Sequence, residues 1–404
     1  MAARDDHVSA RPRAGRPAAR RAASFRRGFR SHHPLVLVVA VVLAAAVLVG
    51  ADWLVRTGAL TSVPEGRFVR YRNDDNAHVT HVMAKLRESP PAGATIYLLG
   101  GSAAMESFLS ERSLGADVGR SAGGEVGLIS LAAHSQSFAE SLALVENLPQ
   151  GRAMLAVGLA PMRFTNGPGD DAGLLYGEPF FLRSRRVRAL LTDQPVSLMP
   201  VDTVVPGVLR YLVGYVRERR HDDLPLFADV GYNQHYTIDG PLHSAAEKYE
   251  MASRDVAEDG TRYGEYADYN FVVLEELVRL ARERGFEVVF FDQPLNEHVV
   301  GATWAGIVPS YRRRALALAD RLGVPYLDVA QRVKLDDRDF LDVYHLVTRG
   351  RLKWQPVFAG QLGAAVRRGG LVTSPLAGAA DASAAAAAAS RLGATASSPA
   401  GGGQ

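Results

Sequence analysis

The chain has 404 residues, of which 47% are hydrophobic and none is cysteine, so it can bury a sizeable core but forms no disulfide. Residues 1–33 hold nine arginines and two aspartates, a net charge of +7, and the 37 basic and 41 acidic residues that follow leave −4 for the rest. Because the basic charge is confined to this tail, the remaining chain lacks the basic face that nucleic-acid binding needs, and we expect no nucleic-acid partner.

Residues 34–51 form an uncharged apolar run of eighteen residues, long enough to cross a bilayer as a helix. Trp53 follows at the place of an interfacial aromatic residue, so we predict a transmembrane helix over 34–55. The arginine-rich residues 1–33 then form a basic cytoplasmic tail, and the rest of the chain is extracytoplasmic.

Two short motifs favour cleavage of this segment instead. The letters "VGA" before Asp52 resemble a signal-peptidase site, and "RRGF" at 26–29 resembles part of a twin-arginine signal. The apolar run is longer than the usual cleavable core, which favours a retained anchor over a signal peptide. Whether the segment is cleaved stays open at this point.

The regions at either end of the chain differ from its middle in composition. Residues 56–94 predict a stalk, with a helix around 78–88 that ends at Ser89-Pro90-Pro91. Residues 370–404 are mostly Ala, Gly and Ser, a composition that buries little apolar surface and predicts a disordered tail.

Between these regions, residues 95–369 alternate strand-like apolar runs with helical patterns, which predicts βαβ units and a parallel sheet covered on both faces. The alternation is lost over about 164–268, where turns and helical pieces predict a mainly helical insertion. The predicted strands are 95–100, 126–131, 153–160, 287–291 and 325–329. The predicted helices are 103–112, 137–148, 184–191, 207–219, 271–284, 311–322 and 354–366.

Ser102 lies where the first predicted strand changes to a helix, in the letters "YLLGGSAAMES". In open α/β sheets this edge is where ligands bind, and a helix start offers free N–H groups to a developing oxyanion. Serine is also a common helix cap, and glycine often only permits the turn. Taken alone, the pattern therefore leaves both a nucleophile and a simple cap open.

Asp342 and His345 lie three residues apart in "DFLDVYHLVTRG", just before the last predicted helix. At this spacing the carboxylate can accept the imidazole Nδ1–H and orient the ring, so that Nε2 takes a proton from a serine hydroxyl. Together with Ser102 the two residues supply a nucleophile, a base and an orienting group. We therefore expect Ser102 Oγ and His345 Nε2 to lie about 3 Å apart.

These motifs resemble the SGNH hydrolase superfamily, and in particular its membrane-anchored branch, which includes the D-alanyl transfer protein of teichoic acid modification and related polysaccharide O-acyltransferases. The Gly100-Gly101-Ser102 turn resembles the first block of that superfamily, and Asp342-Val343-Tyr344-His345 resembles the last. The resemblance covers roughly 95–165 and 285–365 and implies a flavodoxin-like, three-layer α/β fold with a Ser-His-Asp triad. It implies no cofactor and no metal.

The resemblance also implies an oxyanion hole, from which this sequence departs at two places. Ser135 stands where the second block normally has a glycine that donates its backbone N–H. The third block, normally Gly-x-Asn-Asp, should follow the strand "MLAVGLA", but "PMRF" comes next and the usual asparagine is missing. Gln136 and Arg163 are the candidates for a substitute side-chain donor.

Other sites fit the sequence less well. An α/β-hydrolase elbow reads Gly-x-Ser-x-Gly, which Ala104 breaks, and no earlier strand would carry the oxyanion loop. The glycines match neither phosphate-binding pattern. His78 and His81 are spaced to share a helix face, but with no third ligand in view a solvated face is favoured over a metal site.

The sequence thus leads to the hypothesis of a single-pass, extracytoplasmic serine acyltransferase or esterase. The resemblance implies a cell-envelope polysaccharide or teichoic-acid-like acceptor and a multi-spanning acyltransferase as a partner. The missing asparagine supports an alternative, a non-catalytic envelope scaffold or polysaccharide-binding protein on a degenerate fold. Residues 210–223, "RYLVGYVRERRHDD", are amphipathic and fit either a surface helix or a membrane contact.

Overall fold

The computed structural model describes residues 34–372 apart from 197, 199–203 and 235–239. The predicted cytoplasmic tail and nearly all of the predicted disordered tail lie outside the described residues. The chain divides into two compact units, the first ending at Trp53 and the second beginning at Leu54.

Helix α2 (Pro34–Arg56) contains the predicted transmembrane run. Its residues Pro34–Val55 are long and apolar enough to cross a membrane, and only 6% of the most apolar window is buried. Among the described residues it is the one helix that meets this test. Such a helix is consistent with a membrane anchor or a signal sequence.

The second unit is built on a parallel sheet of five strands in the order β2-β1-β3-β4-β5. This is the flavodoxin-like order, in which the chain runs outward from β1 in one direction and then returns to build the other side. The carboxyl ends of β1 and β3 therefore form the switch point at which such sheets bind ligands. The strands are β1 (Thr95–Leu99), β2 (Gly127–Ser130), β3 (Met154–Leu159), β4 (Glu287–Asp292) and β5 (Tyr326–Leu327).

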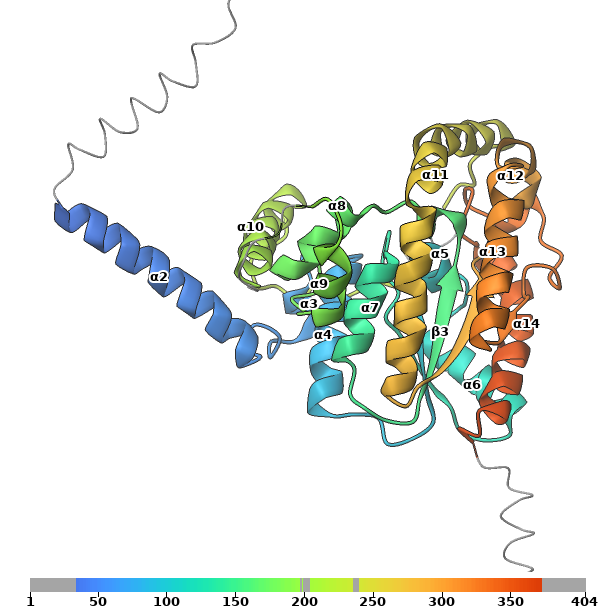
Figure 1. The fold of residues 1–404 in the computed structure, drawn as a ribbon, viewed down its shortest axis with the longest axis horizontal. Helices are drawn as coiled ribbons and strands as arrows, with labels where there is room; N and C mark the ends of the chain where they lie inside the picture. The colour runs from blue at the N-terminus through green and yellow to red at the C-terminus, as the bar shows by residue number, and fades with distance from the viewer. Residues whose placement is uncertain (1–33, 197, 199–203, 235–239, 373–404) are drawn as a thin grey trace, which may run out of the picture. The chain divides into compact units, whose positions relative to one another are not determined.

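Both faces of the sheet are covered by helices, which confirms the three-layer α/β fold (Figure 1). Alternate strand residues supply the two cores: Tyr97 and Leu99 belong to one, and Ile96 and Leu98 belong to the other. The first core is completed by α4 (Asp75–Glu88), α7 (Phe138–Asn147), the end of α11 (Ala245–Glu283) and α13 (Ile307–Leu322). The second is completed by α6 (Glu111–Ala122) and α14 (Thr348–Arg368).

The insertion between β3 and β4 is mainly helical, as predicted. It contains α11, which starts at a capping box formed by Ser244 and Glu247. It also contains the short 3-10 turns Pro161–Phe164 and Ala172–Tyr176 and the helices α8 (Pro168–Asp171), α9 (Arg185–Thr192) and α10 (Val205–His221).

Several predicted elements need correction. The predicted stalk over 56–94 contains α4, whose Val79 and Met83 are buried in the first core, so this part belongs to the folded unit. The predicted helix 103–112 is two helices, α5 (Ser102–Met105) and α6, because Ser110 caps a new helix by accepting the Ser113 N–H. The predicted helix 271–284 is only the end of the 39-residue α11, and β5 is shorter than predicted.

Candidate active site

Ser102 is the first residue of α5, directly after β1 and the two glycines. A side chain at Gly100 would bring its Cβ within 2.7 Å of the Ala104 Cβ, so only glycine allows this tight turn. The turn places Ser102 at the carboxyl end of β1, beside the switch point of the sheet.

His345 reaches Ser102 from the loop before α14. His345 Nε2 lies 2.8 Å from Ser102 Oγ, and His345 Nδ1 lies 2.7 Å from Asp342 Oδ2. The predicted proximity is confirmed, and the two distances form one continuous hydrogen-bonded chain from carboxylate to hydroxyl. With Nδ1–H donating to the carboxylate, Nε2 is left to accept the hydroxyl proton.

Asp342 is held by its own loop. Its Oδ1 accepts the backbone N–H groups of Tyr344 and His345, each at 2.8 Å, which leaves Oδ2 directed at the imidazole. Burial raises the pKa of the Asp342 carboxyl, but the hydrogen bonds from His345 and from the two N–H groups outweigh burial, and the net pKa is lowered. Asp342 is therefore an anion under the conditions in which it would orient the base.

A buried ion pair ties the two segments of the site together. Arg351, in the first turn of α14, donates from Nη2 to Glu106 Oε2 at 2.6 Å and from Nε to the Glu106 carbonyl at 2.9 Å. Glu106 directly follows α5, and both side chains are at most 2% exposed. The pair therefore fixes the helix that starts at Ser102 against the helix that follows His345.

Ser135 lies on the loop after β2 with φ 54°, a left-handed conformation that glycine adopts without strain. Ser135 therefore adopts a strained backbone conformation at this position. The loop is held at two points: the Ala133 N–H donates to the Gly100 carbonyl at 3.1 Å, and the His134 N–H donates to Asp75 Oδ2 at 3.0 Å. These contacts fix the loop beside the Ser102 turn.

Gln136 and Arg163 lie next to this loop but direct their polar groups to its framework. Gln136 accepts the Gly100 N–H at 3.1 Å and donates to the Leu131 carbonyl at 2.7 Å. Arg163 donates to three backbone carbonyls and one hydroxyl, those of Gln136, Gly158, Ser137 and the Ser141 side chain. This geometry favours a positioning role for both residues over the oxyanion-donor role that the sequence suggested.

Ala160 and Pro161 directly follow β3, where the missing asparagine would stand. Ala160 and Pro161 line a cavity of about 20 Å³ together with Ala103 and Tyr344. No side-chain donor comes from Ala160 or Pro161.

The structure adds two residues near the site, Asp75 and His134, that no sequence motif indicates. Asp75, from α4, anchors the Ser135 loop and also accepts a hydrogen bond from the Tyr232 hydroxyl at 3.0 Å. Burial raises the pKa of Asp75 to about 6, although the hydrogen bonds from Tyr232 and His134 lower it. His134 lies close enough to His345 for the two imidazoles to interact, and burial followed by this interaction lowers the pKa of His134. No sequence motif marks Asp75 or His134, because α4 contacts the loop that carries His134 and Ser135 only through tertiary packing.

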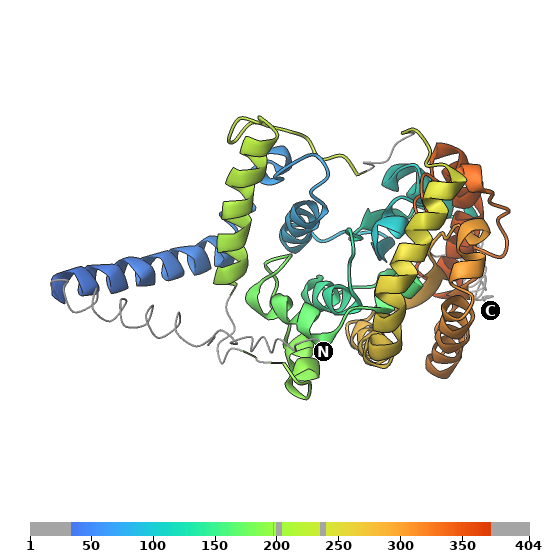
Figure 2. The same ribbon diagram turned by 90° about the horizontal axis from the view of Figure 1, so that it is seen from above.

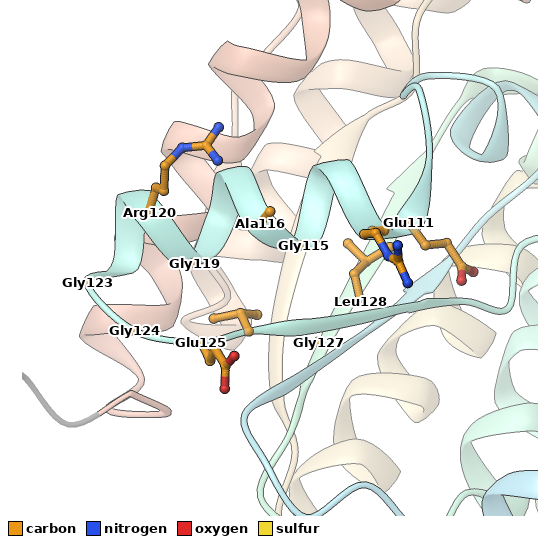
Figure 3. A pocket seen from close by; sticks show the side chains of 12 residues that line it. Glu111, Gly115, Ala116, Gly119, Arg120, Gly123, Gly124, Glu125, Gly127 and Leu128 are labelled. Atoms are coloured by element: carbon orange, nitrogen blue, oxygen red, sulfur yellow. The ribbon is translucent and has the colours of Figure 1, made fainter.

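The structure also contains a larger hollow away from the triad. It has a volume of about 740 Å³ and lies between α6 and the edge strand β2, with Gly115, Gly119 and Gly127 among its lining (Figure 3). None of the triad residues lines it. Across the described ranges, no group of three His, Cys, Asp or Glu side chains is placed to hold a metal ion.

No protein-family model matches this chain, and no curated protein matches its sequence. Among solved structures, the crystal structure of the lipase/acylhydrolase from Enterococcus faecalis is similar over 67% of this chain and 96% of that chain, at 10% sequence identity and a TM-score of 0.29. A similarity this weak carries no functional argument. The α/β assignment rests on the strand order and the two buried cores, and the candidate site rests on the geometry of Ser102, His345 and Asp342.

Proposed function

We propose that this protein is a membrane-anchored, extracytoplasmic serine acyltransferase or esterase that modifies a cell-envelope polysaccharide or teichoic-acid-like polymer by O-acylation. The observation that carries the proposal is the hydrogen-bonded chain from Asp342 through His345 to Ser102, with links of 2.7 and 2.8 Å. This arrangement is the one that activates a serine hydroxyl at neutral pH.

In the proposed reaction, Ser102 Oγ attacks the carbonyl carbon of an acyl donor while His345 Nε2 takes the hydroxyl proton. The backbone N–H groups of Ser102 and Ser135 stabilise the negative oxygen of the tetrahedral intermediate. The intermediate collapses, the bond to the leaving group breaks, and His345 returns the proton to the leaving oxygen. Asp342 stays ionised throughout and stabilises the imidazolium.

The second half of the reaction frees the enzyme. His345 deprotonates an acceptor hydroxyl, which attacks the acyl-serine carbonyl, and Ser102 recovers its proton from the imidazolium. A sugar hydroxyl as acceptor gives transfer, and water gives hydrolysis. Two features support transfer: the sequence resembles the transfer branch of the SGNH hydrolase superfamily, and an anchor would keep the domain beside an envelope polymer. A multi-spanning acyltransferase that brings acyl groups across the membrane is the proposed partner.

A non-catalytic scaffold is the second candidate, favoured by the absence of a side-chain donor from Ala160 and Pro161 after β3. One experiment separates the two: polymer acylation measured in the native host carrying Ser102→Ala, His345→Ala or, as a matched control, Ser107→Ala. Ser107 lies close to the site but donates to the Ala104 carbonyl and is outside the triad. If the protein is an enzyme, Ser102→Ala and His345→Ala lose acylation at an unchanged protein level, and Ser107→Ala keeps it. Retained acylation in Ser102→Ala would reject the enzyme and favour the scaffold.

A further inference from the structure

Helix α10 carries an apolar stripe that faces solvent in the described chain. Leu209, Leu212, Val213 and Val216 are 39%, 39%, 68% and 37% exposed. Their spacing of three, four and seven residues places them on one side of the helix. Four aliphatic side chains aligned in this way form a patch, which single exposed apolar residues do not.

The loop after α10 extends this apolar surface. Leu226 and Phe227 are 42% and 72% exposed, and Phe227 has a φ of 64°. The Phe227 backbone N–H donates to the Tyr215 hydroxyl at 3.3 Å, which fixes the loop to the helix. The Phe227 ring lies against the Tyr215 ring, with 6.2 Å between centroids, but most of it stays exposed on a strained backbone, as expected of a ring with a further contact outside the chain.

The opposite side of α10 is pinned to α3 (Glu65–Phe68), so the stripe cannot turn inward. The Tyr215 hydroxyl donates to the Arg67 carbonyl at 2.9 Å, and the Tyr211 ring stacks on Phe68 with 5.1 Å between centroids. The buried Arg219 donates to the carbonyls of Gly66 and Val69 at 3.1 and 2.7 Å. Figures 1 and 2 show α10 at the end of the second unit opposite α12 (Glu297–Thr303) and α13.

The chain keeps α10 close to the end of the predicted anchor. Helix α2 ends at Arg56 and α3 begins at Glu65, nine residues later. Nine residues span at most about 30 Å, even when fully extended. An anchor that crosses a bilayer therefore holds α3, and with it α10, within reach of the membrane surface at a high effective concentration.

The charges around the stripe suit phospholipid headgroups. The side chains of Arg210 and Arg217 are each 75% exposed although they pair with Glu178 and Glu218, and, seven residues apart, they border the stripe on one side. Arg220 is exposed and continues the stripe one turn beyond Val216. Arginines at the border of an aliphatic stripe can bury their stems in the interface while the guanidinium stays with the headgroups.

We propose that α10 and the loop 224–227 form a second membrane contact, in which the stripe and Phe227 insert into the interface of a bilayer containing anionic lipid. The inference rests on the proposed anchor, because without it the bilayer is not within reach. With two contacts, the anchor and α10, the catalytic unit has a fixed orientation on the membrane instead of rotating freely about one tether. This restricts which part of the envelope Ser102 can reach.

The test uses the absence of cysteine in the full-length chain. Val213→Cys on the stripe and Leu352→Cys on α14 introduce single labelling sites at residues that are 68% and 58% exposed. Each variant is labelled with an environment-sensitive fluorophore and reconstituted into vesicles of phosphatidylcholine with or without phosphatidylglycerol. Quenching is then measured with iodide in the water and with doxyl groups on the lipid chains.

At position 213 we expect a blue-shifted emission, quenching by doxyl groups and loss of quenching by iodide, and each effect should be larger with phosphatidylglycerol. At position 352 we expect full quenching by iodide. Iodide quenching at position 213 equal to that at position 352 in both vesicles would overturn the proposal. So would protection of position 213 in native membranes but not in vesicles, which would indicate a protein partner.

A second variant guards against an effect of the label itself. In Leu209→Cys, the added change Val213→Asp is expected to restore iodide quenching, because a carboxylate in the stripe opposes insertion. Ser102 labelling by a fluorophosphonate is measured in the same samples. If Ser102 reacts with the fluorophosphonate but position 213 remains in water, the membrane contact is refuted and the enzymatic function is not. If position 213 is inserted but Ser102 does not react, the enzymatic function is refuted and the membrane contact is not.

Discussion

Replacing Asp342 with asparagine tests the proposed relay at its least exposed member. The amide oxygen of Asp342→Asn can still accept the two backbone N–H groups that Oδ1 accepts at 2.8 Å, so the loop keeps its shape. The amide NH₂ then faces His345 Nδ1, where the carboxylate oxygen lies at 2.7 Å. An N–H donor at this place makes Nδ1 the acceptor and puts the proton on Nε2, so that His345 can no longer take the Ser102 proton.

The expected loss follows from the charge that is removed. A carboxylate and an imidazolium whose charge centres lie about 4 Å apart attract each other by about 4 kcal/mol at an effective dielectric constant of 20. Losing that attraction in the transition state corresponds to a rate lower by about 10³-fold. The wrong tautomer adds to this, so we expect a fall in kcat of about 10³- to 10⁴-fold. The free energy of unfolding should change by only about 1–2 kcal/mol, because two of the three hydrogen bonds remain.

The assay is the pre-steady-state release of nitrophenol from p-nitrophenyl acetate by the full-length protein in detergent. Asp336→Asn is the matched control, since Asp336 lies in the same region but pairs with Arg349 at the surface. We expect the control to acylate at the wild-type rate and Asp342→Asn to acylate about 10³- to 10⁴-fold more slowly. A folded Asp342→Asn protein with the wild-type acylation rate would refute the reasoning.

Three further predictions concern the framework of the site. In Asp75→Asn the amide keeps a hydrogen-bond acceptor but carries no charge. The wild-type Asp75 carboxyl has a pKa of about 6 in the folded protein, so the folded state holds this proton more tightly than the unfolded chain. The free energy of unfolding of the wild type should therefore fall relative to that of the variant by up to ~3 kcal/mol as pH rises from about 4 to about 6. Denaturant titrations at several pH values check this, and a difference that does not change with pH would contradict it. Arg351→Met removes the buried cation that pairs with Glu106 and should lower the free energy of unfolding by about 3–5 kcal/mol. Adding Glu106→Gln should recover part of this loss. Equal free energies of unfolding for Arg351→Met and the wild type in urea titrations would show that the ion pair does not stabilise the site. Ser135→Gly relieves the left-handed strain and should raise Tm by about 2 °C with acylation retained, whereas a lower Tm by calorimetry would mean that Ser135 is not strained.

The sequence was sufficient for the parts of the fold that repeat a local rule. Buried strands such as Thr95–Leu99 and Met154–Leu159 are continuous apolar runs, and their alternation with helices allows only a parallel sheet covered on both sides. The triad was accessible for the same reason. Ser102 and His345 each belong to a short motif, and the topology of a parallel sheet brings the two motifs to one edge.

The sequence was insufficient where structure depends on contacts between distant segments. The 56–94 region looks like a polar linker with a short helix, and only its packing on the sheet shows that Val79 and Met83 belong to the core. Gln136 and Arg163 have the right chemistry for oxyanion donors, but their donors go to carbonyl groups that no spacing rule identifies. Asp75 was missed because it acts on a loop 59 residues away.

In the proposed mechanism, Ser102 is a nucleophile activated by His345. The most direct measurement is the reaction of the full-length protein with a fluorophosphonate, followed by digestion and mass spectrometry to locate the adduct. We expect an adduct on Ser102 in the wild type, none in Ser102→Ala, and a strongly reduced rate in His345→Ala. A folded wild-type protein without an adduct at Ser102, or an adduct that forms at the same rate in His345→Ala, would contradict it.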